Sequence, residues 1–169
     1  MTRSLLADAF DHHVWATIQV IDACAALSAD QLDATVPGTF GSILATLRHT
    51  VGADAGYLSL LSGGRAAEID EETMDLAELR ATMERHAPVW SALLEQDLDP
   101  DTEVVRYRDD GSTSTAPLGV RIAQVIHHGS DHRSQVCTAL TSIGITPPEI
   151  DVWDRADSQG RLGETPATT

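Results

Sequence analysis

The stretch SLLADAFDHHVWATIQVIDACAAL, residues 4–27, predicts a long amphipathic helix. Its apolar residues recur three or four positions apart, and residues at that spacing lie on one face of a helix. The apolar stripe consists of Leu6, Ala9, Phe10, Val14, Ala16, Val20, Ile21, Cys24 and Leu27. Helical periodicity also dominates most of the remaining sequence, so we expect an all-α protein.

Three more long helices are predicted after this one. They cover approximately residues 41–61, 75–96 and 117–143. Glycine follows the first and the last of them, as expected at a helix C-terminus because glycine tolerates positive φ. Pro88 lies inside the middle one and lacks a backbone N–H, which predicts a kink or break near residues 85–87. Four long helices favour a four-helix bundle, although two long connections leave the helix directions open.

Residues 103–115, EVVRYRDDGSTST, have a different pattern. A β-prone run is followed by Asp-Asp-Gly, which favours a turn, and then by a Thr-rich run. We therefore expect a small hairpin before the last helix. The 169 residues are enough for one domain and too few for two. We expect that domain at residues 1–155, followed by a mobile polar tail at residues 156–169.

The chain is strongly acidic, with 26 Asp and Glu residues against 11 Lys and Arg residues. A negative field repels phosphate backbones and anionic lipid, so we expect no binding to nucleic acid or to membranes. The N-terminal sequence has acidic residues and histidines where a signal peptide needs an apolar run, which favours a cytoplasmic protein. Cys24 and Cys137 lie far apart in apolar surroundings, as expected for buried reduced thiols.

Three of the seven histidines lie in HHGSDHRSQV, residues 127–136. His128 and His132 are four positions apart on the less polar face of the predicted helix, so both imidazoles should point inward. Two neutral imidazoles at this spacing can share a divalent cation, although ordinary hydrogen bonds can also satisfy such a pair. His127 is expected on the solvated face. A third ligand is needed to favour a metal site.

His49 is a candidate for that third ligand. It lies midway along the helix at residues 41–61, on a face of small residues that includes Gly52 and Gly56. Glycine costs about 1 kcal/mol relative to alanine inside a helix, so both glycines need an explanation. Close helix packing and an open pocket beside His49 each provide one.

His13 lies on the apolar stripe of the first helix. A fourth ligand, a hydrogen-bonding partner of a ligand, a proton shuttle and a hydrogen-bonded core residue are all compatible with that position. His86, near Pro88, has no recognisable partner in the sequence. The sequence contains no GxSxG elbow and no Gly-rich phosphate loop, so nucleophilic serine catalysis and nucleotide binding are not indicated.

Three segments resemble the DinB (YfiT-like) superfamily and together cover most of residues 5–155. They are FDHHVWATIQVIDACAALSADQL, PGTFGSILATLRHTVGADAGYLSLLSG and VIHHGSDHRSQVCTALTSIGITPPEIDVWD. The resemblance implies a four-helix bundle, a homodimer, and one divalent metal ion bound by His49, His128 and His132. The metal is expected to be zinc, with nickel, iron or manganese as alternatives. His12 and His13 stand where the family often has Tyr and Asn.

The resemblance also implies a chemistry. Three protein ligands leave one coordination position open, as in catalytic metal sites, where a bound water or thiol becomes a nucleophile. We expect thiol transfer or isomerisation with a low-molecular-weight thiol cosubstrate, or hydrolysis, of a small-molecule substrate. His13 and Gln135 are the candidate catalytic residues, and Arg133 is left between substrate binding and a surface ion pair. The alternative is a non-catalytic, stress-related bundle that binds metal or ligand.

Overall fold

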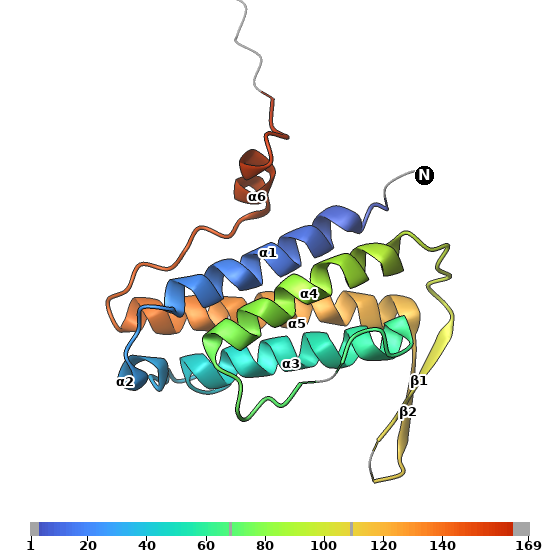
Figure 1. The fold of residues 1–169 in the computed structure, drawn as a ribbon, viewed down its shortest axis with the longest axis horizontal. Helices are drawn as coiled ribbons and strands as arrows, with labels where there is room; N and C mark the ends of the chain where they lie inside the picture. Colours follow the sequence, from blue (N-terminus) through green and yellow to red (C-terminus); the bar gives the residue numbers. More distant parts are fainter. Residues whose placement is uncertain (1–3, 68, 109, 164–169) are drawn as a thin grey trace, which may run out of the picture.

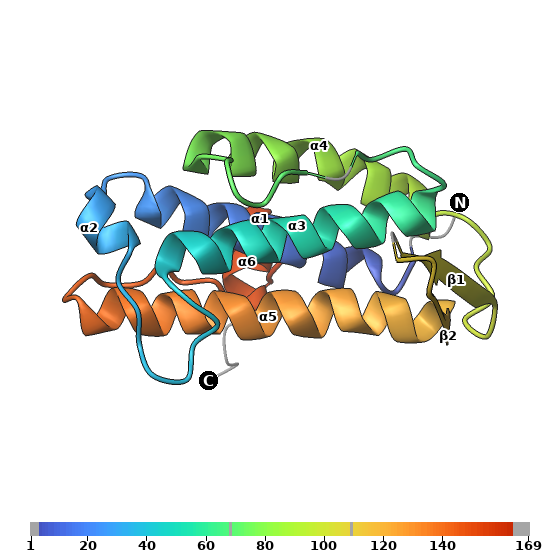
Figure 2. The same ribbon diagram turned by 90° about the horizontal axis from the view of Figure 1, so that it is seen from below.

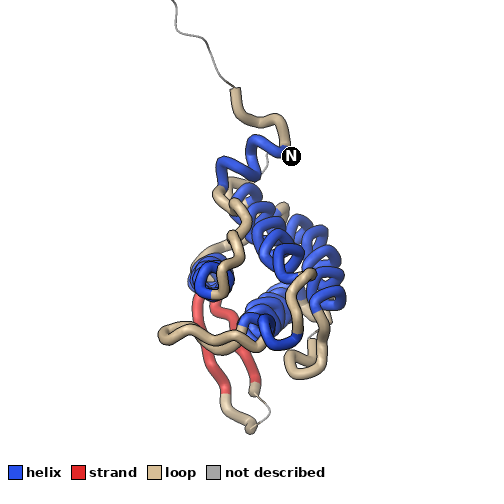
Figure 3. The backbone as a smooth tube through the Cα atoms, turned by 90° about the vertical axis from the view of Figure 1, so that its left-hand side faces the viewer, coloured by secondary structure: helices blue, strands red, loops and turns tan. Residues whose placement is uncertain are grey.

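The structure is a computed structural model that describes residues 4–67, 69–108 and 110–163. It is mostly helical, as predicted, and contains a two-stranded sheet. Its long helices lie side by side (Figures 1 and 2) and are α1 (Ala7–Cys24), α3 (Ile43–Ser62), α4 (Leu76–Leu94) and α5 (Leu118–Ser142). Both α1 and α3 pack against α4 and α5 (Figure 3). Buried residues of these long helices belong to one core cluster.

Apolar side chains from all the long helices build this core. The predicted stripe of the first helix is buried at Phe10, Val14, Ala16, Val20, Ile21 and Cys24. The other helices add large side chains that are less than 2% exposed, among them Leu47, Leu58, Leu79, Met83, Trp90 and Leu140. Full burial of such a side chain stabilises the fold by about 1.5–3 kcal/mol. Leu6 of the predicted stripe is instead 39% exposed, because α1 begins only after it.

The helix ends follow the capping signals in the sequence. Ser28 and Gln31 form a capping box at the start of α2 (Ala29–Leu32). Helix α3 begins after Ser42, whose side chain accepts a hydrogen bond from the Ala45 amide, and it ends at Gly63 with a φ of 69°. That left-handed conformation is why a glycine stands there.

Pro88 does not break its helix. Helix α4 runs from Leu76 to Leu94 with the proline inside it, so the predicted break is wrong. The missing N–H and the ring clash of proline destabilise a helix. The surrounding turns are held in place because α4 packs against both α1 and α3, burying Met83 and Trp90.

The predicted hairpin is confirmed. Strands β1 (Glu103–Tyr107) and β2 (Thr113–Pro117) are antiparallel, and Val105 pairs with Thr115. The hairpin projects from the end of the helices at which α5 begins (Figure 1). Arg121 ties it to α5, because its Nη2 donates hydrogen bonds to the carbonyls of Val104 at 2.9 Å and Ser114 at 3.0 Å.

A further short helix, α6 (Val152–Ser158), was not predicted and contains the expected start of the tail at residue 156. It lies against α1, where the Arg155 guanidinium donates two hydrogen bonds of 2.8 Å to Asp11. Residues 164–169 of the predicted tail lie outside the described residues. No helix in the described ranges combines the length and hydropathy needed to cross a membrane.

Candidate metal centre

The three histidines singled out in the sequence meet between α3 and α5. His128 Nε2 lies 3.1 Å from His49 Nε2 and 3.1 Å from His132 Nε2. One ligand atom from each histidine lies within 4.8 Å of the other two. His128 and His132 come together because residues four apart share a helix face, whereas His49 is brought to them by the packing of α3 on α5.

These nitrogens suit a divalent metal ion. Imidazole nitrogens bind zinc at about 2.0–2.1 Å, which separates two ligands of a tetrahedral site by roughly 3.3 Å. The two spacings of 3.1 Å in the cluster are close to this value. Three converging imidazole nitrogens are also the donor set that zinc and other late transition metals prefer. The residues therefore fit the ion that the sequence predicts.

The environment keeps His128 neutral. Burial, together with the neighbouring His132 and His49, lowers the pKa of His128 from 6.5 to about 4. At neutral pH this imidazole therefore has a lone pair available. His132 is buried, while the His49 side chain is 29% exposed, so the cluster is accessible from the side of α3.

Gly52 has a specific role beside His49. A Cβ atom at Gly52 would lie 2.2 Å from the carboxylate of Glu71, which comes from the connection between α3 and α4. The glycine thus makes room for Glu71, whose Oε2 is 3.4 Å from His49 Nδ1. Gly56 differs, because a Cβ atom there would meet nothing within 4 Å. Open space beside the helix therefore explains Gly56, whereas the close approach of the Glu71 side chain explains Gly52.

Gln135 contacts the cluster through His132, at the ring nitrogen that faces away from His128. Its Oε1 is 3.1 Å from His132 Nδ1 and accepts a hydrogen bond of 2.9 Å from the Phe40 amide. The Phe40 ring stacks on His49, with ring centroids 4.1 Å apart and an angle of 8° between the planes. Phe40 is 54% exposed and was not predicted as a site residue. Its position depends on the connection between α2 and α3, which has no sequence periodicity.

His13 occupies a different place, inside the core. Its Nε2 is 2.9 Å from Asp54 Oδ1, and its Nδ1 is 3.1 Å from Arg133 Nη1. Arg133 is 3% exposed and also donates to Thr17 Oγ1 at 3.1 Å, so it forms neither a surface ion pair nor an exposed contact for substrate. His13 and Arg133 thus belong to a buried network, and the hydrogen bonds of His13 go to this network and not to the three histidines.

Asp54 is the centre of this buried network and was not predicted as a site residue. His86 Nδ1 donates to its Oδ2 at 2.6 Å, and Trp90 Nε1 to its Oδ1 at 3.1 Å. Burial alone would raise the pKa of Asp54, but hydrogen bonds from His13 and His86 lower it to about 2. An acidic residue on the apolar face of α3, between the buried residues Val51 and Leu58, was the available signal.

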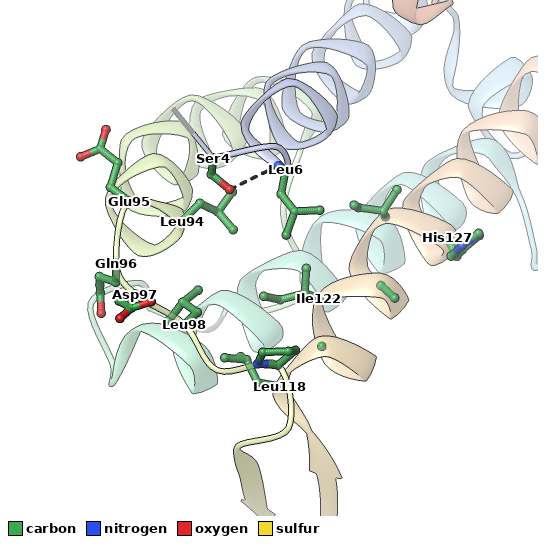
Figure 4. Close-up of a pocket in the computed structure, with 14 residues that line it drawn as sticks. Ser4, Leu6, Leu94, Glu95, Gln96, Asp97, Leu98, Leu118, Ile122 and His127 are labelled. Carbon is green, nitrogen blue, oxygen red and sulfur yellow. Dashed lines mark hydrogen bonds between the residues drawn. The ribbon is translucent and has the colours of Figure 1, made fainter. Parts of the chain in front are cut away.

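A cavity of about 520 Å³ lies away from the three histidines. It is enclosed by the segment before α1, the end of α4 and the start of α5 (Figure 4), and its wall includes Leu94, Leu118 and Ile122. His127, which the sequence places on the solvated face, lines this cavity (Figure 4). None of the three clustered histidines does. The cluster is therefore approached from another face.

Comparison with known proteins identifies the family. The DinB family model matches residues 1–167, which is nearly the whole chain and includes every histidine of the cluster. No curated protein matches the chain. The family match agrees with the segments of sequence that surround His49 and the pair His128 and His132, and with the mostly helical structure. The chain belongs to the DinB family.

Proposed function

We propose that His49, His128 and His132 bind one divalent metal ion, and that the protein is a metal-dependent enzyme acting on a small-molecule substrate. The observation that carries this proposal is the convergence of the three Nε2 atoms, with two spacings of 3.1 Å. Zinc is the best candidate because it favours tetrahedral sites with nitrogen ligands, and nickel, iron and manganese are the alternatives.

A metal ion held by three protein ligands supplies a site at which a water or thiol loses its proton near neutral pH. The chain contributes a neutral His128, a partly exposed His49 and the exposed apolar ring of Phe40 beside them. An apolar surface next to the reacting group favours a substrate with an apolar part. The family resemblance favours transfer or isomerisation with a low-molecular-weight thiol, with hydrolysis as the second choice.

Catalytic roles for His13 and Gln135 remain predictions. The contacts of His13 with Asp54 and Arg133 favour a structural role for this residue, because all three side chains are buried. Gln135 contacts His132 and Phe40, so it is better placed to act through them than on a substrate.

The helix arrangement, the oligomeric state and the cellular location of the protein are also proposals. We infer that the long helices form the four-helix bundle expected for the family, and that the protein works as a homodimer in the cytoplasm. Both cysteines are free, which suits a reducing compartment. The net charge of −15 supports the absence of nucleic-acid binding.

A non-catalytic metal-binding or ligand-binding role is the alternative. The two functions are separated by the reaction of a low-molecular-weight thiol with an electrophile, measured with metal-loaded protein before and after chelation. A catalysed rate that disappears on chelation supports the enzyme. If several cellular thiols give no rate above the uncatalysed reaction while metal stays bound, the binding role replaces the enzyme.

A further inference from the structure

One amide oxygen connects a predicted ligand to the chain segment that precedes α3. Gln135 Oε1 lies 2.9 Å from the backbone nitrogen of Phe40 and 3.1 Å from His132 Nδ1. Gln135 is on α5, one turn of helix after His132, whereas Phe40 is 95 residues earlier in the sequence. The same oxygen therefore serves two partners that are unrelated in sequence.

The contact with Phe40 determines how the Gln135 amide is oriented. A backbone N–H can only donate, so the atom facing it must be the carbonyl oxygen of Gln135 and not its NH₂ group. The same oxygen faces His132 Nδ1. Because that oxygen can only accept, His132 must carry its proton on Nδ1. His132 Nε2 is then left with a lone pair, and this nitrogen is the one that faces His128 Nε2 at 3.1 Å.

Phe40 extends the effect to a second ligand. Its ring stacks on His49 with centroids 4.1 Å apart and meets the edge of His132, with centroids 5.4 Å apart and an angle of 79°. Thr39 braces the same loop by donating to the Val36 carbonyl at 2.8 Å. The backbone contact with Gln135 thus sets where the aromatic ring lies against the cluster.

The other partner of the cluster is weaker. Glu71 Oε2 lies 3.4 Å from His49 Nδ1, and the Glu71 side chain is 45% exposed. A longer contact to an exposed side chain fixes a ring less firmly than the two short contacts of Gln135. The control of ring orientation is therefore concentrated at Gln135.

We propose that Gln135 is a positioning residue of the metal centre: its amide oxygen holds the His132 tautomer that points Nε2 into the cluster, and it holds Phe40 against His49. This inference rests on the proposed metal site. A hydrogen-bond acceptor on the outer nitrogen of a ligating histidine fixes the ring and makes it more basic, and its loss typically costs 10–100-fold in metal affinity.

The test compares Gln135→Leu with Gln135→Glu, which keeps an acceptor oxygen. Gln124→Leu, an equivalent change on the exposed face of α5, is the control. Cobalt(II) affinity and the visible spectrum of the cobalt(II) protein are measured together with the tautomer of His132 in the metal-free protein, by long-range proton–nitrogen NMR. Thermal unfolding checks that each variant is folded, and Gln135→Ala replaces Gln135→Leu if the latter does not fold.

Gln135→Leu should weaken cobalt(II) binding by about 10–100-fold, alter the visible spectrum and remove the preference of His132 for the Nδ1 proton. Gln135→Glu should stay within a few-fold of the native protein, and Gln124→Leu should match it. Unchanged affinity in Gln135→Leu, or an Nδ1 proton that stays in place without the acceptor, overturns the proposal. Equal losses in the Leu and Glu variants also overturn it, because the acceptor oxygen would then be irrelevant.

Phe40→Ala separates the two parts of the proposal. It removes the ring but keeps the backbone N–H, so the His132 tautomer should persist while cobalt(II) affinity falls by less than in Gln135→Leu. The loss of cobalt(II) affinity in the double variant should be smaller than the sum of the losses in the two single variants, because the two residues act through one contact. Fully additive losses contradict the coupling.

The NMR measurement keeps this proposal separate from the proposed function. If the native protein binds no cobalt(II), zinc or nickel, the metal site is wrong. The His132 tautomer in the metal-free protein still shows whether Gln135 orients the ring.

Discussion

Asp54 on α3 and His13 on α1 are joined by a hydrogen bond of 2.9 Å at a place where both side chains are at most 2% exposed. Arg133 donates to the other ring nitrogen of His13, so His13 must be neutral and must donate its Nε2 proton to Asp54. A neutral histidine thus bridges a buried carboxylate and a buried guanidinium. Because His86 and Trp90 also bind Asp54, the network joins α1, α3, α4 and α5.

Replacing this carboxylate should destabilise the protein strongly. Asp54→Asn removes the charge but keeps the shape, leaving the buried Arg133 uncompensated. Breaking a buried pair from one side typically costs 3–5 kcal/mol, so we expect a loss of about 3 kcal/mol in urea unfolding. Asp97→Asn, at an exposed position, is the control and should change stability by less than about 0.5 kcal/mol. A loss below about 1 kcal/mol in Asp54→Asn contradicts the network.

The same carboxylate should make stability sensitive to acid. The pKa of Asp54 is about 2 in the folded protein, below its ordinary value of 3.8. Between these values the unfolded chain binds more protons than the folded one, so stability falls as pH decreases. The contribution of Asp54 is therefore complete above about pH 4 and is lost between about pH 4 and pH 2. Urea unfolding at several pH values should show a shallower acid slope in Asp54→Asn than in the native protein.

Two glycines inside long helices should respond in opposite ways to alanine. At Gly129 on α5 an added Cβ would lie 2.5 Å from His13 Cε1, so Gly129→Ala must displace the buried network and should cost about 2 kcal/mol. At Gly56 on α3 the added Cβ meets nothing within 4 Å. Gly56→Ala should therefore stabilise the fold by about 0.5–1 kcal/mol through helix propensity. Chemical unfolding of both variants measures the contrast, and a stabilised Gly129→Ala would show that the close approach is wrong.

Metal binding should depend on the clustered histidines and not on their neighbour. Elemental analysis of protein purified without a histidine tag should find about one transition metal ion per chain. His49→Ala, His128→Ala and His132→Ala should each lose it, whereas His127→Ala, at an exposed position, should retain it. Undiminished metal in the first three variants would refute the site.

The metal-free protein should also lose stability in mild acid because of His128. Its pKa is lowered from 6.5 to about 4 in the folded protein, so between these values the unfolded chain binds more protons. Stability should therefore fall as pH decreases from about 6.5 to about 4. His128→Leu removes this group, and its stability should depend less on pH in that range. The comparison is made by urea unfolding in the presence of a chelator, and identical pH profiles would show that the His128 pKa is not lowered.

Local sequence features predicted the long helices and much of the site. Apolar spacing located the long helices, and Gly63 marked the end of α3. The four-residue spacing of His128 and His132 made them neighbours whatever the rest of the chain does. His49 was found through its small-residue surroundings and the family resemblance. The break expected at Pro88 does not occur, because the local effect of the proline was outweighed by the packing of α4 on α1 and α3.

The sequence by itself thus determined the helices and the His128 and His132 pair, because both follow from interactions within one or two helical turns. Only the tertiary structure decided that His13 bridges Asp54 and Arg133 inside the core, and that Gln135 joins His132 to Phe40. Those contacts join residues 41 to 120 positions apart, with the one exception of His132 and Gln135. No local pattern encodes them, because they arise only when packing of the helices brings distant polar groups together where water is excluded.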